Sequence, residues 1–221
     1  MNPAILLRPL AAACLVLAAF ATSAQAQDAT AGQKKAAMCI GCHGIIGYQA
    51  SFPQVHHVPK IGGQNAKYIA SALAAYKKGD RKHPTMRAVA ASLSDQDMAD
   101  LAAFYEAQGG GSLKSVSDTA PAAAPADVSA LLAKGACASC HGANFNKPID
   151  PAYPKLAGQY GDYLTVALRA YATEGNPQVG RSNPIMGAQV KQFKAAELKA
   201  IAEYIATLPG DVRTEPEPRF R

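Results

Sequence analysis

The sequence of 221 residues predicts an all-α protein built from two tandem domains of the same kind. A Cys-x-x-Cys-His pentapeptide occurs at residues 39–43 and again at residues 137–141, and the segments that follow the two copies match each other in order. Apolar residues in these segments recur every three to four positions, which is the period of an amphipathic helix. No stretch has a convincing β-strand pattern. The two copies therefore indicate a duplicated helical domain.

Residues 1–26 have the layout of a secretory signal peptide. A single positive charge, Arg8, precedes an apolar run at 10–21, and small residues at 24–26 form a cleavage site. The apolar run is too short to favour a permanent membrane span. We therefore expect an exported chain, located in the periplasm, that is either soluble or peripherally associated with the membrane.

The N-terminal domain is expected over residues 27–108. Residues 59–64 (Pro-Lys-Ile-Gly-Gly-Gln) precede an amphipathic helix, which Gly79 is expected to end. A loop with Pro84 and a methionine follows. A last helix begins at Ser94, whose hydroxyl is expected to cap the helix N-terminus.

The C-terminal domain, expected over residues 127–221, repeats this order. Residues 154–159 (Pro-Lys-Leu-Ala-Gly-Gln) match the first copy, and Gly175 is the expected end of the following helix. Between the domains, residues 109–126 have a linker composition rich in Gly, Ser, Ala and Pro. The polar tail from Gly210 is expected to wrap or fray. Because each domain is small, we expect roughly four helices around a cofactor that supplies much of the apolar interior.

Cysteine usage indicates what the two motifs bind. Cys14 falls in the signal peptide, and the other four of the five cysteines lie inside the motifs, so none remains for a structural disulfide. Cys-x-x-Cys-His is the attachment site of c-type haem. Cys39 and Cys42 would bind the vinyl groups of one porphyrin, and Cys137 and Cys140 those of another. A shared zinc site is disfavoured, because ribbon-type zinc sites place their pairs much closer together. The sequence thus predicts two covalently bound haem c groups with their irons.

The axial ligands of the two irons are predicted from the same repeat. His43 and His141 are the expected proximal ligands. The chain after His141 has no further histidine and only one methionine, Met186, which is therefore the expected sixth ligand. Met86 aligns with it after a matched proline. His83 lies three residues from Met86, so a bis-histidine iron stays open at the first haem.

Four other side chains of ligand type are expected to have different roles. Met38 is adjacent to a motif cysteine and cannot readily reach the opposite haem face, and Met98 falls within the last helix of its domain. His56 and His57 are expected to be loop residues. Two irons held by histidine and methionine have no open position for a substrate. We therefore expect no catalytic residues and no enzymatic activity.

These motifs together resemble the cytochrome c4 family, exported dihaem electron carriers made of two class I cytochrome c domains. The resemblance covers residues 31–208 and rests on the paired Cys-x-x-Cys-His-Gly and Pro-Lys-(Ile/Leu)-x-Gly-Gln segments and on the two loop methionines. It implies that the carbonyls of Pro59 and Pro154 accept a hydrogen bond from the proximal imidazoles, and that haem propionates lie near the domain interface. Residues 52–58 depart from the second copy, which lacks their two histidines.

The resemblance implies a function in respiration. A periplasmic carrier of this kind would take electrons from a quinol-oxidising donor and deliver them to a membrane-bound terminal oxidase, one electron per haem. Two alternatives stay open: the haem subunit of a dehydrogenase such as a flavocytochrome, and a dihaem peroxidase or thiosulfate-oxidising enzyme. The two candidate methionines and the lack of a spare cysteine disfavour the enzyme.

The charge pattern bears on the partner. The formal net charge is +6, and export makes nucleic acid an implausible partner. A basic bias fits an acidic docking protein. We expect the N-terminal haem to be the docking end, because five basic residues surround its candidate methionine: Lys77, Lys78, Arg81, Lys82 and Arg87. The equivalent C-terminal loop has Arg181 opposed by Glu174.

Overall fold

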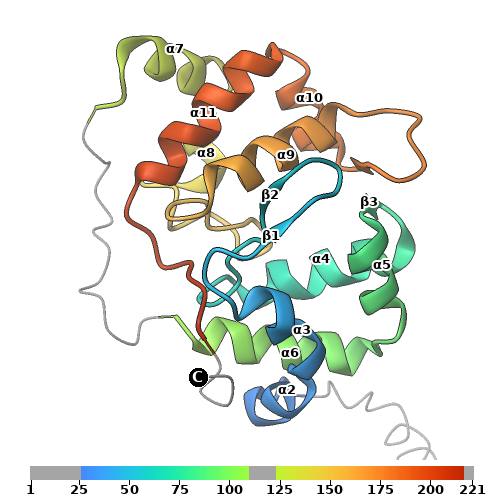
Figure 1. Ribbon diagram of the computed structural model, residues 1–221. Coiled ribbons are helices and arrows are strands. Elements are labelled where there is room, and N and C mark those ends of the chain that lie inside the picture. The colour runs from blue at the N-terminus through green and yellow to red at the C-terminus, as the bar shows by residue number, and fades with distance from the viewer. Residues whose placement is uncertain (1–25, 110–122, 217–221) are drawn as a thin grey trace, which may run out of the picture.

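The computed structural model describes residues 26–109 and 123–216, which form two helical domains stacked on each other (Figure 1). In Figure 1 the N-terminal domain is the lower one, in blue and green, and the C-terminal domain is the upper one, in yellow to red. Two predicted segments lie mostly outside the described residues: residues 1–25 of the predicted signal peptide and residues 110–122 of the predicted linker.

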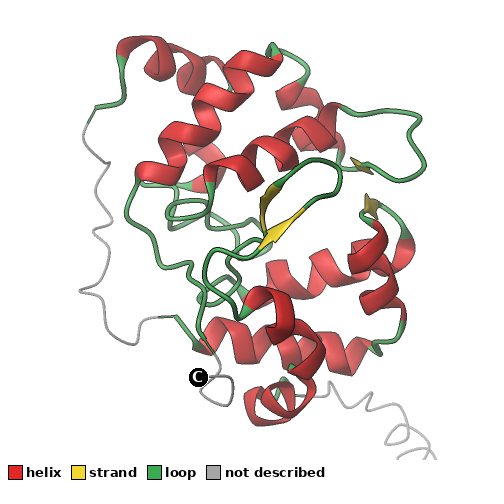
Figure 2. Cartoon of the chain, in the orientation of Figure 1, coloured by secondary structure: helices red, strands yellow, loops and turns green. Residues whose placement is uncertain are grey.

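The N-terminal domain packs five described helices around its half of the interface (Figure 2). Its elements are α2 (Ala29–Lys35), α3 (Ala37–His43), β1 (Gln49–Ala50), β2 (His56–His57), α4 (Ala66–Lys78), β3 (Arg81–Lys82), α5 (Pro84–Ala91) and α6 (Asp95–Ala107).

The C-terminal domain repeats the helices but not the first pair of strands. Its elements are α7 (Ala126–Lys134), α8 (Cys137–His141), α9 (Gly161–Ala172), β4 (Gly180–Arg181), α10 (Pro184–Val190) and α11 (Ala195–Thr207). Each domain therefore has five described helices, where roughly four were expected. The prediction that strands are absent is wrong in detail: β1 pairs antiparallel with β2, and β3 with β4. Strands of two residues are too short to leave an alternating pattern in a sequence.

Helix ends follow the predicted signals in two of three places. Gly79 caps α4 with a φ of 94°, a left-handed conformation that glycine adopts without strain. Ser94 caps α6 in a reciprocal capping box with Asp97. The prediction for Gly175 is wrong, because α9 already ends at Ala172 and is capped by Thr173.

The core of the N-terminal domain is built around α6, which packs against α4 and is crossed by α2. Gly32 makes this crossing possible, since a Cβ atom there would lie 2.0 Å from the carbonyl oxygen of Asp100. Lys35 completes it with ion pairs of 2.7 Å to both Asp97 and Asp100. Met98 is buried in this core at 3% exposure, in agreement with its predicted position in the last helix.

The repeated Pro-Lys-x-x-Gly-Gln segments join the two domains. The side-chain amide of Gln64 bonds the backbone of Lys155, accepting from its N–H at 2.9 Å and donating to its carbonyl at 2.9 Å. Gln159 does the same to Lys60, at 2.9 Å and 2.8 Å. Both glutamines are buried. The segment that the repeat revealed is therefore the main polar contact between domains.

The C-terminal tail also ties the domains together. After α11 the chain runs back to the N-terminal domain, as the red segment in Figure 1 shows. There Arg213 and Gly62 exchange two backbone hydrogen bonds of 2.9 Å and 3.0 Å. The described part of the tail thus wraps; its last five residues, 217–221, lie outside the described residues.

Candidate functional site

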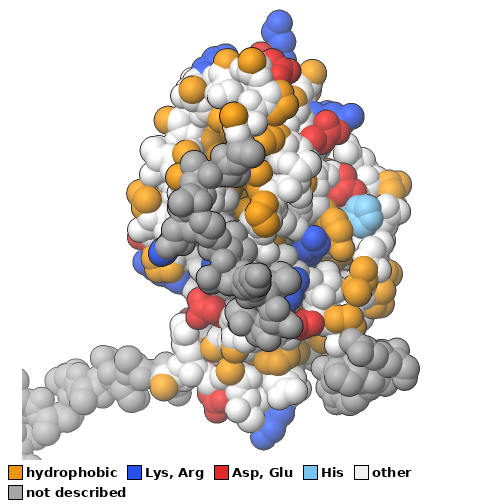
Figure 3. Space-filling view, turned by 90° about the vertical axis from the view of Figure 1, so that its left-hand side faces the viewer, with side chains coloured by type: hydrophobic (Ala, Val, Ile, Leu, Met, Phe, Trp, Pro, Cys, Tyr) orange, Lys and Arg blue, Asp and Glu red, His pale blue; other side chains and the backbone are white. Residues whose placement is uncertain are grey.

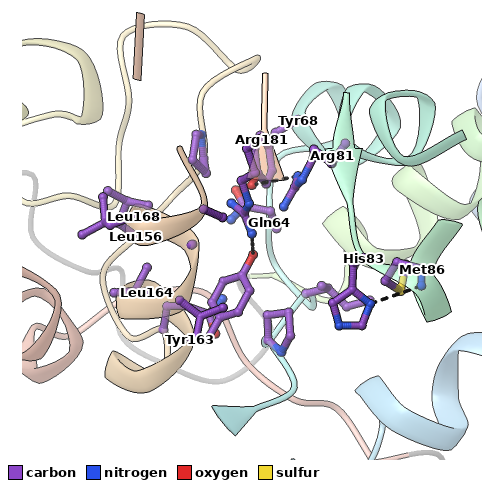
Figure 4. Close-up of a pocket in the computed structure, with 18 of the residues that line it drawn as sticks. Gln64, Tyr68, Arg81, His83, Met86, Leu156, Tyr163, Leu164, Leu168 and Arg181 are labelled. Carbon is purple, nitrogen blue, oxygen red and sulfur yellow. Dashed lines mark hydrogen bonds between the residues drawn. The ribbon is translucent and has the colours of Figure 1, made fainter. Parts of the chain in front are cut away.

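A largely apolar cavity of about 650 Å³ lies between the two domains and extends into both. The structure brings all eight predicted site residues to its wall: Cys39, Cys42, His43, Met86, Cys137, Cys140, His141 and Met186. Figure 4 shows part of this wall, with side chains from both domains converging on it. The two predicted sites are therefore neighbours, opening toward the domain boundary.

In the N-terminal domain, helix α3 places the two cysteines and His43 on one turn. The Nδ1 atom of His43 lies 2.8 Å from the carbonyl oxygen of Pro59. Because a carbonyl only accepts, Nδ1 carries the proton and the lone pair is on Nε2. Burial lowers the pKa of His43, although the Pro59 hydrogen bond opposes this. The imidazole is therefore neutral at pH 7, as a metal ligand must be.

The C-terminal domain repeats this arrangement. The Nδ1 atom of His141 lies 3.2 Å from the carbonyl oxygen of Pro154, and burial lowers the pKa of this histidine too. The hydrogen bonds expected of Pro59 and Pro154 are both present. Each fixes the tautomer and the plane of its ring, which is the usual contribution of groups behind a ligating histidine.

The methionines lie in the first turn of a short helix in each domain. Proline is the first residue of α5 and of α10, and the methionine follows two residues later. The N–H of Met186 donates to Oδ1 of Asn183 at 2.9 Å, and the N–H of Met86 donates to Nδ1 of His83 at 3.4 Å. His83 therefore caps α5 in the way that Asn183 caps α10. Figure 4 shows His83 beside Met86.

Arg81 and Arg181 meet at the domain boundary within the cavity. They are register partners in the β3–β4 pair. Arg81 lies over the ring of Tyr76 at 4.6 Å, and Arg181 donates to the hydroxyl of Tyr163 at 3.2 Å. Burial would raise the pKa of Tyr163, but the two guanidinium groups outweigh it and lower that pKa to about 8. The field at this place is strongly positive.

This positive pair suits a cofactor with acidic groups. Among the described residues, neither Arg81 nor Arg181 forms an ion pair with a carboxylate, and the Nε atom of Arg81 has no hydrogen-bond partner. Buried like charges are costly unless an anion compensates them. An apolar cavity with two Cys-x-x-Cys-His motifs and a cationic centre fits two porphyrins that carry carboxylate groups.

Comparison with known proteins identifies the family. A family model described as Cytochrome c matches residues 29–107 and 125–209. Cytochrome c4 of Azotobacter vinelandii is 33% identical over 202 residues, a match covering 83% of this chain and 90% of that protein. This chain belongs to the cytochrome c4 family. It is a dihaem electron-transfer cytochrome with two covalently bound haem c groups.

Two further relatives of this cytochrome are informative. The thiosulfate dehydrogenase electron acceptor of Stutzerimonas stutzeri is 31% identical over 209 residues, covering 90% of this chain and 92% of that protein. The crystal structure of reduced recombinant cytochrome c4 from Pseudomonas stutzeri matches with a TM-score of 0.59 at 28% identity, covering 83% of this chain and 100% of that one. The all-α fold of two tandem cytochrome c domains is thereby confirmed.

The predicted basic docking face of this cytochrome needs correction. Arg81 is buried at the domain boundary, and Nζ of Lys82 donates across that boundary to the carbonyl of Asn176 at 2.7 Å. Lys77 donates to the carbonyl of Leu93 at 2.5 Å. Basic residues that are close together in the sequence therefore lie in different environments in the fold. The charges of the cluster that stay at the surface are those of Lys77, Lys78 and Arg87.

His56 and His57 of this cytochrome are not simple loop residues, as predicted, but form strand β2. His56 is 4% exposed and stacks on Tyr163 of the other domain, with 6.4 Å between ring centres. His57 bonds Asp162, also of the other domain. Sequence reasoning missed this contact; the signal was that the insertion has two adjacent histidines without counterparts in the second copy.

In the part of the chain that the structure describes, no helix is both long enough and apolar enough to cross a bilayer.

Proposed function

We propose that each domain of this cytochrome holds one haem c and that the chain carries electrons in the periplasm. Thioethers from Cys39 and Cys42 would attach the N-terminal haem, and thioethers from Cys137 and Cys140 the C-terminal haem. The observation that carries this proposal is the convergence of both motifs and both methionines on one apolar cavity. Each haem, when bound, supplies a one-electron Fe(III)/Fe(II) couple.

The protein side chains set the properties of that couple. Nε2 of the neutral His43 is available as one axial ligand, and Met86 approaches from a different element as the other. His141 and Met186 would do the same in the second domain. A thioether ligand raises the reduction potential relative to a second imidazole. The helix-capping role of His83 supports Met86 over His83 as the ligand.

Two saturated irons favour a carrier rather than an enzyme. We propose that no residue of this chain is catalytic, because histidine and methionine ligands would leave peroxide and thiosulfate no position on the iron. Export of the chain rests on the predicted signal peptide. The electron donor would be a quinol-oxidising complex and the acceptor a membrane-bound terminal oxidase.

A second candidate role has specific support. The similarity to the thiosulfate dehydrogenase electron acceptor favours a dehydrogenase as the donor. In that role the chain still carries electrons, but they come from a dehydrogenase rather than from a quinol-oxidising complex. Affinity capture from native membranes, with the partners identified by mass spectrometry, separates the two: an oxidase supports the first role and a dehydrogenase the second.

The ligands can be tested by spectroscopy. The mature protein should have the mass of two covalent haems and the near-infrared absorption band of sulfur-ligated ferric haem. Met186→Ala should remove about half of that band, and Met86→Ala the other half. A single haem by mass would contradict the cofactor assignment. A native band that Met86→Ala leaves at full strength would assign the first site to His83 instead.

A further inference from the structure

A hairpin of the N-terminal domain reaches into the C-terminal domain. It consists of β1, β2 and the loop 51–55 between them, and its register pairs Gln49 with His57 and Ala50 with His56. The second domain has no equivalent pair among its described residues. In Figure 1 the hairpin lies between the two domains, below α9 and above α4.

One edge of the hairpin follows helix α9. The Oδ2 atom of Asp162 accepts from the backbone N–H of His57 at 3.0 Å and from its ring Nδ1 at 2.7 Å. Farther along, Arg169 donates to the side chain of Gln54 at 3.5 Å. Seven residues of helix span about 10 Å, and three residues of extended chain span about the same. The hairpin therefore lies along the helix over this whole distance.

Asp162 makes two of the hydrogen bonds in this contact. Its burial opposes ionisation, but the hydrogen bonds from His57 outweigh burial and lower the pKa of the carboxyl group. It is ionised at neutral pH and belongs to the first turn of α9, where a negative charge is favourable. The ring of His57 also stacks on Tyr160 at 4.5 Å between centres.

The other side of the hairpin faces the N-terminal haem site. Phe52 of the hairpin and the two residues that flank the hairpin, Tyr48 and Val58, line the same cavity as His43 and Met86. The ring of Phe52 meets the ring of His83 edge-on, with 5.7 Å between centres. His83 in turn accepts the hydrogen bond from the N–H of Met86. A continuous series of contacts thus leads from α9 of one domain to the methionine of the other.

We propose that Asp162 is a positioning residue for the N-terminal haem: by holding the hairpin, the C-terminal domain closes the methionine side of the other domain's haem pocket. This inference rests on the proposed function, because it takes the N-terminal haem to lie between His43 and Met86. Releasing the hairpin exposes the Met86 side of that pocket, which Phe52 and His83 line, to water. Greater solvent exposure stabilises the ferric state and lowers the reduction potential.

The test compares Asp162→Ala with Asp150→Ala in the intact dihaem protein. The two aspartates are matched, since each accepts a nearby backbone N–H and pairs with a basic side chain of the other domain. Asp150 pairs with Lys67 at 3.2 Å, away from the hairpin. Hydrogen exchange is read on the peptide that contains the amides of His57 and Val58, the latter bonded to the carbonyl of Tyr48 at 2.8 Å.

Asp162→Ala should speed exchange in this peptide at least tenfold and lower the potential of the N-terminal haem alone. Asp150→Ala should change neither. Met186→His lowers the potential of the C-terminal haem. Adding it to both variants separates the reduction step of that haem from the step of the N-terminal haem, so that the N-terminal potential can be assigned. His57→Ala keeps the Asp162 side chain and its bond from the backbone N–H of residue 57, so it should produce both effects to a smaller extent. A poorly folding Asp162→Ala therefore does not block the test.

Three results would overturn the inference. Unchanged exchange would show that Asp162 does not hold the hairpin. Faster exchange with an unchanged N-terminal potential would show a contact without influence on the haem, and equal shifts of both haems would show a general loosening of the interface. A native protein without two sulfur-ligated haems would instead contradict the proposed function itself.

Discussion

Arg81 of the N-terminal domain and Arg181 of the C-terminal domain lie opposite each other across the domain boundary, as partners in a two-residue antiparallel pair. Each is surrounded by tyrosines of its own domain, and the two guanidinium groups lower the pKa of Tyr163 to about 8 although its burial would raise it. Both arginines line the cavity that contains the two predicted cofactor sites.

The first prediction concerns this pair. Arg81→Met keeps most of the side-chain volume and removes one positive charge, and a positive charge near a haem favours Fe(II). Both potentials should fall, by up to about 60 mV, which is tenfold in a one-electron equilibrium constant. Spectroelectrochemical titration measures this. Arg87→Met, which removes an exposed charge, should have a much smaller effect, and equal effects would contradict a role for the buried pair.

The second prediction concerns the glutamines that join the domains. Gln64→Ala removes three hydrogen bonds, one of them from the backbone N–H of Asn65, and leaves the backbone N–H and carbonyl of Lys155 without their side-chain partner. Unsatisfied buried groups cost about 1–3 kcal/mol. The free energy of unfolding in denaturant should fall by about this amount, and Gln159→Ala should behave alike. Gln192→Ala, at an exposed position, is the control; a loss as large there would show that the cost is not specific to the interface.

The third prediction concerns acid stability. Hydrogen bonds from Lys35 and from the backbone of Asp28 hold the pKa of Asp100 below its ordinary value. A carboxyl group with a lowered folded-state pKa stabilises the protein above its unfolded pKa, about 4, and loses this contribution as the pH falls through the folded-state value. Native stability should therefore decline below about pH 4.

Asp100→Asn provides the comparison for this acid effect. The variant should be less stable than the native protein at pH 7, and the gap should narrow as the pH is lowered toward 2. Thermal unfolding of the dihaem protein across this range measures both curves. A constant gap would mean that ionisation of Asp100 contributes nothing to folding.

The fourth prediction concerns the remaining surface charges near Met86. Lys78 and Arg87 stay exposed, whereas Arg81 and Lys82 are committed to the domain boundary. Reversing both exposed residues to Glu should slow oxidation of the reduced protein by ferricyanide, an anionic oxidant, and should flatten its dependence on salt, because screening at 0.15 M shortens the reach of charge to about 8 Å.

Lys191 and Lys199 supply the control for the charge reversal. They are exposed on the other domain, where Lys191 pairs with Glu174 and Lys199 with Glu203, as Lys78 pairs with Asp80 in the N-terminal domain. Reversing these two to Glu should alter the stopped-flow rate much less. Equal slowing by the two double variants would reject the N-terminal haem as the preferred docking end.

The sequence by itself determined the chemistry and the repeat. Cys-x-x-Cys-His is a local motif, because attachment to one porphyrin requires two thiols and an imidazole within a single helical turn. Aligning the copies paired Met86 with Met186, and a capping serine marked where α6 begins. Each of these features depends on residues close together in the chain, so a linear pattern carries it in full.

Only the tertiary structure decided how the halves meet. Arg81 looked like one more surface charge beside Lys82, yet it is buried against Arg181, a hundred positions away. Gln64 read as part of a repeated loop, but its amide bonds the other domain. The interface roles of Arg81 and Gln64 depend on which faces of the two domains pack together. The pattern of residues along the chain does not specify that packing. Arg81 and Gln64 belong to the interface because the packing of the two domains buries them, and residue type alone does not reveal that burial.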